Sequence, residues 1–135
     1  MEKTFRLDII ASDHPFYNGE CEMIVFLGLD GEFGVLPNHE PMVTCLNAGE
    51  IRFKVNGEWK YAATSTGIVE IMPNFVVILA DTVEKPEEID IKRAEEAKER
   101  AEERLRQKQS IKEYYHTQAA LNRAMSRLKV TKKHG

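Results

Sequence analysis

The chain has 135 residues, of which 42% are hydrophobic and 30% are charged, and its formal net charge is −3. This length allows one small domain with an appended element, but not two full domains. Residues 1–88 carry six Lys and Arg against fifteen Asp and Glu, whereas residues 89–135 carry thirteen against seven. The acidic first part excludes electrostatic binding of nucleic acid there, and the basic second part could attract an anion.

The start of the chain and its hydropathy argue against secretion and membrane insertion. Met1-Glu2-Lys3-Thr4 opens no leader-like apolar run, and the longest apolar run, residues 75–80, is far shorter than a membrane-spanning helix. Cys21 and Cys45 have no CxxC spacing and lie in apolar surroundings. We therefore expect both to be buried, reduced thiols of a cytoplasmic protein.

The sequence between Thr4 and Ala80 predicts short β-strands, because apolar residues alternate with others over short segments. These segments cover residues 5–10, 21–27, 51–55, 60–64, 68–71 and 75–80. Residues that tolerate turn geometry separate them, namely Asn18-Gly19, Asp30-Gly31, Gly34, Pro37-Asn38, Asn47 to Gly49, Asn56-Gly57 and Pro73-Asn74. Many short antiparallel strands with tight turns predict a sandwich or barrel.

The composition changes after Thr82, since Pro86 is the last proline and no glycine follows before Gly135. Asp90 is a candidate N-cap for a helix that ends near Gln109. A second helix is expected to start at Ser110-Ile111-Lys112-Glu113, which has the spacing of a capping box.

Together these patterns predict an all-β N-terminal sandwich, residues 1–85, followed by a C-terminal antiparallel α-helical hairpin, residues 86–135. The apolar stripe of the first helix is thin and rich in alanine, so the hairpin would be weakly anchored and could dock in more than one place. From composition alone, a coiled-coil hairpin used for dimerisation is an equally good interpretation.

Two motifs resemble the epsilon subunits of bacterial F-type ATP synthases. The stretch from Asp30 to Met42, DGEFGVLPNHEPM, is similar to the family pattern D-G-E-x-G-[IV]-L-P-x-H-x-P. The segment from Gly67 to Ala80 is similar to a second pattern of the family, so the likeness spans essentially the whole chain. Asn38 and Thr66 stand where family members often have glycine; asparagine tolerates a left-handed backbone, whereas threonine does so poorly.

The resemblance implies a non-catalytic rotor subunit of the central stalk, peripheral on the cytoplasmic side of the cell membrane. In this family the sandwich loops contact the gamma subunit and the ring of c subunits. The hairpin can be folded onto the sandwich or extended along gamma towards the alpha and beta subunits, where it inhibits ATP hydrolysis while the enzyme couples proton flow to ATP synthesis. The residues expected to contact partners are Asp30, Gly31, Glu32, Pro37 and His39.

The segment from Ile89 to Ala94, IDIKRA, matches the I-D-x-x-R-A motif by which some of these subunits bind ATP. Arg93 and Arg100 share one helix face, as do Arg123 and Arg127, and an antiparallel hairpin could bring the pairs together around a polyphosphate. The resemblance thus implies ATP as a regulatory ligand, which Mg²⁺ can accompany. The candidate residues are Glu84, Ile89, Asp90, Arg93, Ala94, Arg100, Arg123 and Arg127.

The spacing alone leaves a plainer interpretation open, in which these charges are solvated helix faces and Asp90 is only an N-cap. No catalytic or metal-binding residue is predicted. His39 has acidic neighbours, but the sequence offers no Ser/His/Asp order, no HExxH and no phosphate-binding glycine loop, so a bound nucleotide would be a signal and not a substrate. A small hydrolase or metal protein and a dimeric coiled-coil adaptor are the rival functions.

Overall fold

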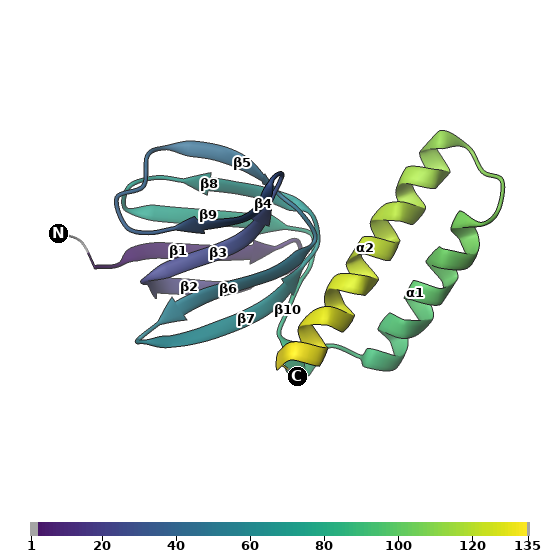
Figure 1. Cartoon of the computed structure of the whole chain (residues 1–135). Coiled ribbons are helices and arrows are strands. Elements are labelled where there is room, and N and C mark those ends of the chain that lie inside the picture. The colour runs from purple at the N-terminus through teal and green to yellow at the C-terminus, as the bar shows by residue number, and fades with distance from the viewer. Residues whose placement is uncertain (1–2, 135) are drawn as a thin grey trace.

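The computed structural model describes residues 3–134 and shows a β-sandwich followed by a helical hairpin (Figure 1). This arrangement confirms the fold class expected from the sequence. One sheet has the order β2-β1-β9-β8-β5 and the other the order β10-β7-β6-β3-β4. The strands are β1 (Phe5–Ala11), β2 (Pro15–Cys21), β3 (Met23–Gly28), β4 (Gly31–Val35), β5 (Met42–Leu46), β6 (Gly49–Val55), β7 (Glu58–Thr64), β8 (Gly67–Ile71), β9 (Phe75–Ala80) and β10 (Val83–Glu84). The helices are the 3-10 turn η1 (Pro86–Glu88), α1 (Ile91–Leu105) and α2 (Ile111–His134).

The hydrophobic core lies between the two sheets and follows from strand alternation. In β1, Phe5, Leu7 and Ile9 are buried, whereas the residues between them are less so. The facing sheet contributes Phe26 and Phe53, which are 0% and 2% exposed. Since burial of one such side chain contributes about 1.5–3 kcal/mol, this shared core is the main source of stability in the sandwich.

Several strands differ from those expected. Asn18-Gly19 is not a turn, because both residues lie inside β2 and pair with Asp8 and Leu7 of β1. Strands β4, β5 and the two-residue β10 are also absent from the segments that the sequence predicts. Strands β2, β4, β5 and β10 are edge strands, which pair on one side only and show little of the apolar alternation that reveals a buried strand. One pair is also parallel, since β1 runs in the same direction as β9.

The two cysteines lie in different surroundings. Cys21 is buried, and this burial raises the pKa of its thiol to about 11. Cys45, in contrast, is exposed on edge strand β5, so the expectation that both thiols are buried is wrong for Cys45. Both are free thiols. The apolar residues beside Cys45 in the sequence did not predict its side, because neighbours along a strand point to opposite faces.

Side-chain caps set the starts of both helices. The backbone N–H of Arg93 donates to Oδ1 of Asp90 at 3.0 Å, which confirms Asp90 as an N-cap. The N–H of Glu113 likewise donates to Oγ of Ser110 at 3.2 Å. The Glu113 carboxylate does not close a capping box, however, because it binds Arg104 at 3.2 Å.

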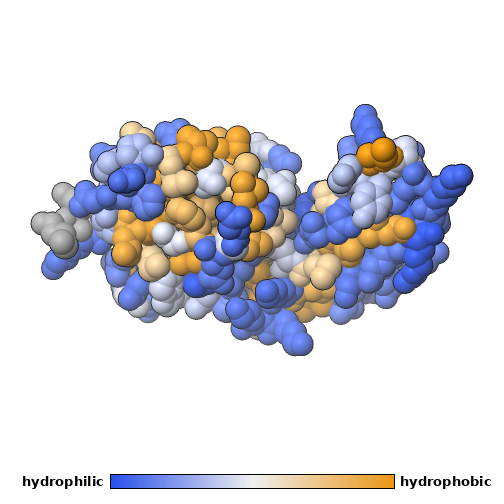
Figure 2. Space-filling model, turned by 45° about the horizontal axis from the view of Figure 1, so that its top comes forward, coloured by the Kyte–Doolittle hydropathy of each residue, from blue (hydrophilic) through white to orange (hydrophobic). Residues whose placement is uncertain are grey.

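The hairpin contacts the sandwich through the C-terminal part of α2, while α1 lies on the far side of α2 (Figure 1). Val130 is 1% exposed and packs with Ala63 of β7 and Ile89. The helices meet through small side chains, and Ala94, Ala101 and Ala124 are buried. Figure 2 shows the contrast between the largely hydrophilic hairpin and a sandwich surface with many hydrophobic residues. Within residues 3–134, neither helix combines the length and apolar character needed to cross a membrane.

Candidate functional site

The two helices border an open groove of about 470 Å³. Three alanines form part of its lining, so the helices approach closely and the longer side chains stand at its rims. Basic residues from both helices face the same hollow. The lining residues are Ala97, Arg100, Ala101, Arg104, His116, Thr117, Ala120, Arg123 and Arg127.

The arginines of this interhelical groove are only partly neutralised. Nε of Arg127 contacts Oε1 of Glu84 at 2.5 Å, and Arg104 is bound to the carboxylate of Glu113. Over residues 3–134, neither Arg100 nor Arg123 forms an ion pair with a carboxylate. Two unpaired guanidinium groups from different helices therefore border the same groove, an arrangement that an anion with several oxygens can bridge.

Glu84 connects this groove to the sandwich. It lies on β10, and its side chain and that of Arg127 are each less than 30% exposed. The ion pair thus joins the last strand of the sandwich to α2 at the point where the hairpin docks. A small hollow lined by Glu84, Arg123 and Arg127 lies at the same junction.

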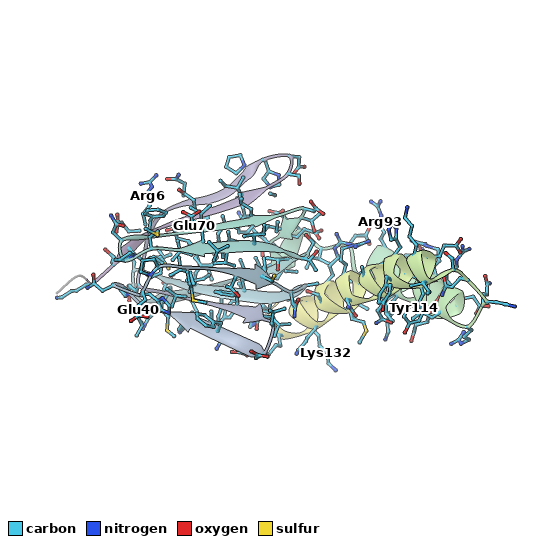
Figure 3. All side chains as sticks on the ribbon, turned by 90° about the horizontal axis from the view of Figure 1, so that it is seen from above. Arg6, Glu40, Glu70, Arg93, Tyr114 and Lys132 are labelled. Carbon is cyan, nitrogen blue, oxygen red and sulfur yellow. The ribbon has the colours of Figure 1, made fainter. Side chains whose placement is uncertain are left out.

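The residues of the I-D-x-x-R-A motif lie in several different surroundings. The Asp90 carboxylate caps α1, Ala94 is buried, and Ile89 packs beneath α2. Arg93 is exposed, does not line the interhelical groove, and projects outward from the hairpin in Figure 3. The structure therefore gathers Arg100, Arg123 and Arg127 along the groove, places Glu84 beside Arg127, and leaves Arg93 outside.

Sequence reasoning missed three residues of the groove lining, Arg104, His116 and Thr117. Helical spacing could have found two of them. Arg104 lies four residues after Arg100 and His116 seven residues before Arg123, so each shares a face with a candidate arginine. Thr117 carries no such signal.

The candidate partner residues of the sandwich lie at opposite ends of β4. Asp30, Gly31 and Glu32 lie at the β3–β4 turn, which faces the hairpin (Figure 1). The Arg52 guanidinium, 2.9 Å from Glu32, hydrogen-bonds to that carboxylate and holds its pKa below the usual value. The other two candidate partner residues, Pro37 and His39, follow the C-terminal end of β4.

Pro37 and His39 form this far end together with Asn38, whose N–H donates to the carbonyl of Pro73 at 2.8 Å. Nδ1 of His39 lies 2.7 Å from the carbonyl oxygen of Glu40, and its ring is 5.7 Å from that of Phe33. These contacts shape the loop. In the part of the chain that the structure describes, no three His, Cys, Asp or Glu side chains gather as metal ligands would.

Two family models together match nearly all of the chain. Residues 4–86 match the ATP synthase, Delta/Epsilon chain, beta-sandwich domain, and residues 87–132 match the ATP synthase, Delta/Epsilon chain, long alpha-helix domain. The chain belongs to the ATP synthase epsilon chain family. The resemblance stated from its motifs is thereby confirmed, and membership makes it a subunit of ATP synthase other than the catalytic one.

Named relatives agree over almost their full length. The chain is 48% identical to the ATP synthase epsilon chain of Ruminiclostridium cellulolyticum, covering 95% of this chain and 96% of the relative. It is 45% identical to that of Caldanaerobacter subterraneus subsp. tengcongensis, covering 99% and 98%. A chain of the Euglena gracilis mitochondrial ATP synthase superposes with a TM-score of 0.80 at 22% identity, covering 93% of this chain and 80% of that one, which supports the fold.

Proposed function

We propose that this epsilon chain is a rotor subunit of the central stalk that couples proton flow to ATP synthesis and restrains ATP hydrolysis through its hairpin. ATP, which Mg²⁺ can accompany, is the regulatory ligand in this proposal. Family membership supports the role in ATP synthase. The interhelical groove is the observation that supports regulation by ATP.

The groove suits a polyphosphate because its positive charge is unbalanced and comes from both helices. Arg100 on α1 and Arg123 on α2 have no carboxylate partner among residues 3–134, and Arg127 shares its charge with Glu84. A triphosphate could accept hydrogen bonds from these guanidinium groups at once. Separating the helices would break the set, so ATP binding favours the folded hairpin.

The folded hairpin also engages basic residues that extension would release. Arg127 is paired with Glu84, and Lys133 lies 3.6 Å from Glu50. In the extended position these cations would face the acidic surfaces that we propose on the beta subunits, and would oppose rotation in the hydrolysis direction. High ATP would hold the hairpin folded and release this restraint.

The sandwich is the part proposed to contact the gamma subunit and the c-ring, on the cytoplasmic side of the membrane. What supports a docking face is an exposed apolar row on the sheet that contains β1, β9 and β8. Ile10 pairs with Leu79, which pairs with Ile68, and their exposures are 39%, 47% and 51%. Adjacent exposed apolar side chains of this kind are typical of an interaction surface.

The proposal is tested by the ATP dependence of hydrolysis in the assembled enzyme. With residues 87–135 removed, hydrolysis at low ATP should rise, while ATP synthesis persists. Arg100→Ala should shift the ATP concentration that releases inhibition upward, because loss of a charged hydrogen bond weakens binding by about 1.5–3 kcal/mol, or roughly 10- to 150-fold.

Arg106→Ala is the matched control. Arg106 follows α1, binds Glu103 at 2.9 Å and does not line the groove, so its loss should leave the ATP dependence unchanged. If the truncated complex hydrolyses ATP no faster than the intact one, the hairpin is not the brake. If Arg100→Ala and Arg106→Ala behave alike, the groove is not the ATP sensor.

A further inference from the structure

A pocket of about 380 Å³ lies at the edge of the sandwich, where β2 of one sheet approaches β6 and β7 of the other, close to η1. We name it the aromatic pocket. Its volume lies within the range of about 300–1,000 Å³ that is usual for small-molecule sites. It shares no lining residue with the interhelical groove, so it is a separate place on the molecule.

Aromatic side chains make up much of the lining. Phe16 and Tyr17 of β2 and Tyr61 of β7 are half-buried, so part of each ring remains accessible. Phe53 is only 2% exposed and packs against Tyr17, with ring centroids 4.9 Å apart. A flat ring that enters the pocket can therefore pack face-to-face or edge-to-face against the accessible rings.

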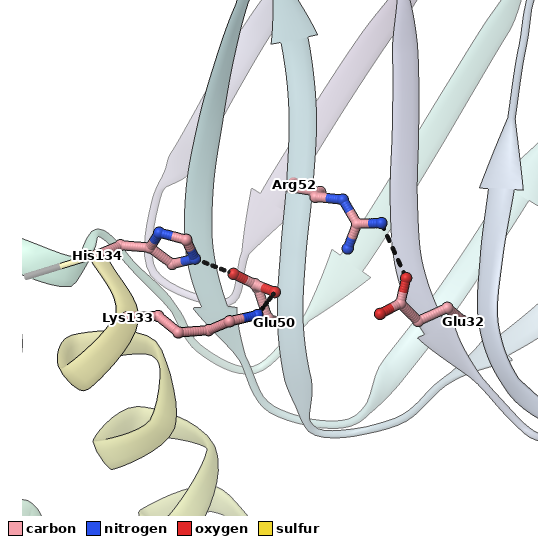
Figure 4. A network of polar contacts seen from close by, with 5 residues as sticks. All are labelled: Glu32, Glu50, Arg52, Lys133 and His134. Carbon is pink, nitrogen blue, oxygen red and sulfur yellow. Dashed lines mark hydrogen bonds and ion pairs between the residues drawn. The ribbon is translucent and has the colours of Figure 1, made fainter.

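Other contacts hold these rings in place. The Tyr17 hydroxyl donates to the carbonyl oxygen of Glu20 at 2.7 Å. The ring of Tyr61 stacks on that of His134, with centroids 3.6 Å apart, and Nε2 of His134 contacts the carboxylate of Glu50 (Figure 4). A site formed in advance in this way loses little side-chain freedom when a ligand binds.

Charged side chains stand at the mouth of the aromatic pocket. Lys60 of β7 and Lys85, which precedes η1, are exposed, and over residues 3–134 neither forms an ion pair with a carboxylate. Glu87 is also exposed there and has no cationic partner in the same range. The two lysines outweigh this one carboxylate. Because Glu87 repels further negative charge, the mouth suits a ligand with a single negative charge better than a polyphosphate.

We propose that the aromatic pocket binds a small aromatic carboxylate. The ring packs against Phe16, Tyr17 and Tyr61, and the carboxylate is bound by Lys60 and Lys85 at the mouth. This class of ligand uses both features of the pocket, because an uncharged ring leaves the lysines without a partner and a small inorganic anion leaves the aromatic surface in water. Binding here does not depend on the proposed function.

The test is an NMR titration of the full chain with benzoate, in which the backbone amide signals are followed. The signals of Tyr17, Tyr61 and Glu87 should shift in a saturable way. Cyclohexanecarboxylate has the same charge but no aromatic ring, so it should bind about 2- to 10-fold more weakly. Benzamide keeps the ring and lacks the charge, so it should also bind more weakly than benzoate.

Variants of the lining separate the two contributions. Lys60→Ala and Lys85→Ala should each weaken benzoate binding by about 2- to 5-fold, the usual effect of an exposed charge pair. Phe16→Leu keeps an apolar side chain but removes a ring, so it should weaken benzoate binding more than cyclohexanecarboxylate binding. Lys54→Ala is the matched control, because Lys54 lies on β6, also lacks a carboxylate partner in the described part of the chain, and does not line the pocket.

Arg100→Ala separates this proposal from the ATP sensor. Arg100 lines the interhelical groove and not the aromatic pocket, so the variant should bind benzoate like the wild type while its ATP binding weakens. The proposal is overturned if the benzoate shifts do not saturate or fall outside the pocket. It is equally overturned if benzamide or cyclohexanecarboxylate binds as tightly as benzoate, if Lys54→Ala weakens binding as much as Lys85→Ala, or if Arg100→Ala abolishes it.

Discussion

Gly67 lies where β8 passes too close to β9 to admit a side chain. A Cβ atom added there would lie 1.9 Å from the carbonyl oxygen of Leu79 and 3.0 Å from Cα of Ala80. Both atoms belong to the backbone of the paired strand, so no side-chain rotation can relieve the contact. Glycine is needed at this position because of the close approach.

Gly67→Ala is therefore expected to destabilise the sandwich by at least about 1–3 kcal/mol, the usual range for overpacking. The midpoint of chemical denaturation measures this change. Gly28→Ala is the control, because its added Cβ would have ordinary contacts, the nearest at 3.5 Å from the oxygen of Gly31. Equal midpoints for the two variants would show that β8 and β9 separate easily.

Asn38 and Thr66 show how far the residue type predicts the backbone conformation at positions where the family often has glycine. Asn38 has a φ of 67°, the left-handed conformation that asparagine tolerates, as its place in the motif suggests. Thr66 is not among the described residues with positive φ. Glycine is therefore not needed at position 66 in this chain.

The last turn of α2 fastens the hairpin to β6 and β7. The Glu50 carboxylate, whose side chain is 13% exposed, is contacted by His134 and Lys133, and the His134 ring stacks on Tyr61 with centroids 3.6 Å apart. Val130 is the buried apolar contact one turn earlier. Few contacts hold the helix here, so losing one should be measurable.

Glu50→Gln should weaken docking of α2 by about 1 kcal/mol, because a charge-assisted contact becomes a neutral one. Amide hydrogen exchange in residues 130–134 should then accelerate about 5-fold, as the undocked form becomes more populated. Glu113→Gln removes a carboxylate at the opposite end of the hairpin and should leave this exchange unchanged. Unchanged exchange in Glu50→Gln would mean that the Glu50 carboxylate does not contribute to docking of the helix.

At the scale of elements, local sequence predicts the helices better than the edge strands. Asp90 and Ser110 mark helix starts because capping is local chemistry. The end of α1 is less well predicted: it stops at Leu105 and not near Gln109, and the following N–H of Arg106 turns back to Glu103. Strand β5 pairs with β8, which is distant in sequence, so no local pattern contains its partner. Strand β4 pairs with the neighbouring β3, but its two glycines and its lack of apolar alternation hide it in the sequence.

The sandwich and the hairpin differ in how much hydrophobic core each contributes. The main hydrophobic cluster is drawn entirely from residues 5–83, and the hairpin segment adds only Ile89 and Val130 to a separate small cluster. We therefore expect residues 1–86 to fold without the hairpin.

A chain of residues 1–86 should give a β-type circular dichroism spectrum and a cooperative thermal transition, because the sandwich core remains intact. The full-length chain serves as the reference. A broad, non-cooperative transition in the short chain would show that the sandwich depends on α2.

The candidate site is only partly predictable from sequence. Helical periodicity places Arg123 and Arg127 on one face of α2, and the family motif adds Arg100. Which arginines meet depends on the relative rotation of two alanine-lined helices, and that rotation leaves Arg93 outside the groove. The hollow between α2 and the sandwich was not predicted either, since it is lined by α2 together with strands and connections that lie far from α2 in the sequence.

The parallel pairing of β1 with β9 sets an order for folding during synthesis. Arg6 pairs with Phe75 and Ala11 with Ala80, so β1 cannot complete its sheet until nearly the whole sandwich has left the ribosome. Closing so long a loop is slow compared with forming a helical hairpin, whose contacts are local. In a chain made at about 5–20 residues per second, the N-terminal strands wait for several seconds with an unpaired edge. This interval, before β9 emerges, is when the nascent chain is most exposed to aggregation and to chaperone binding.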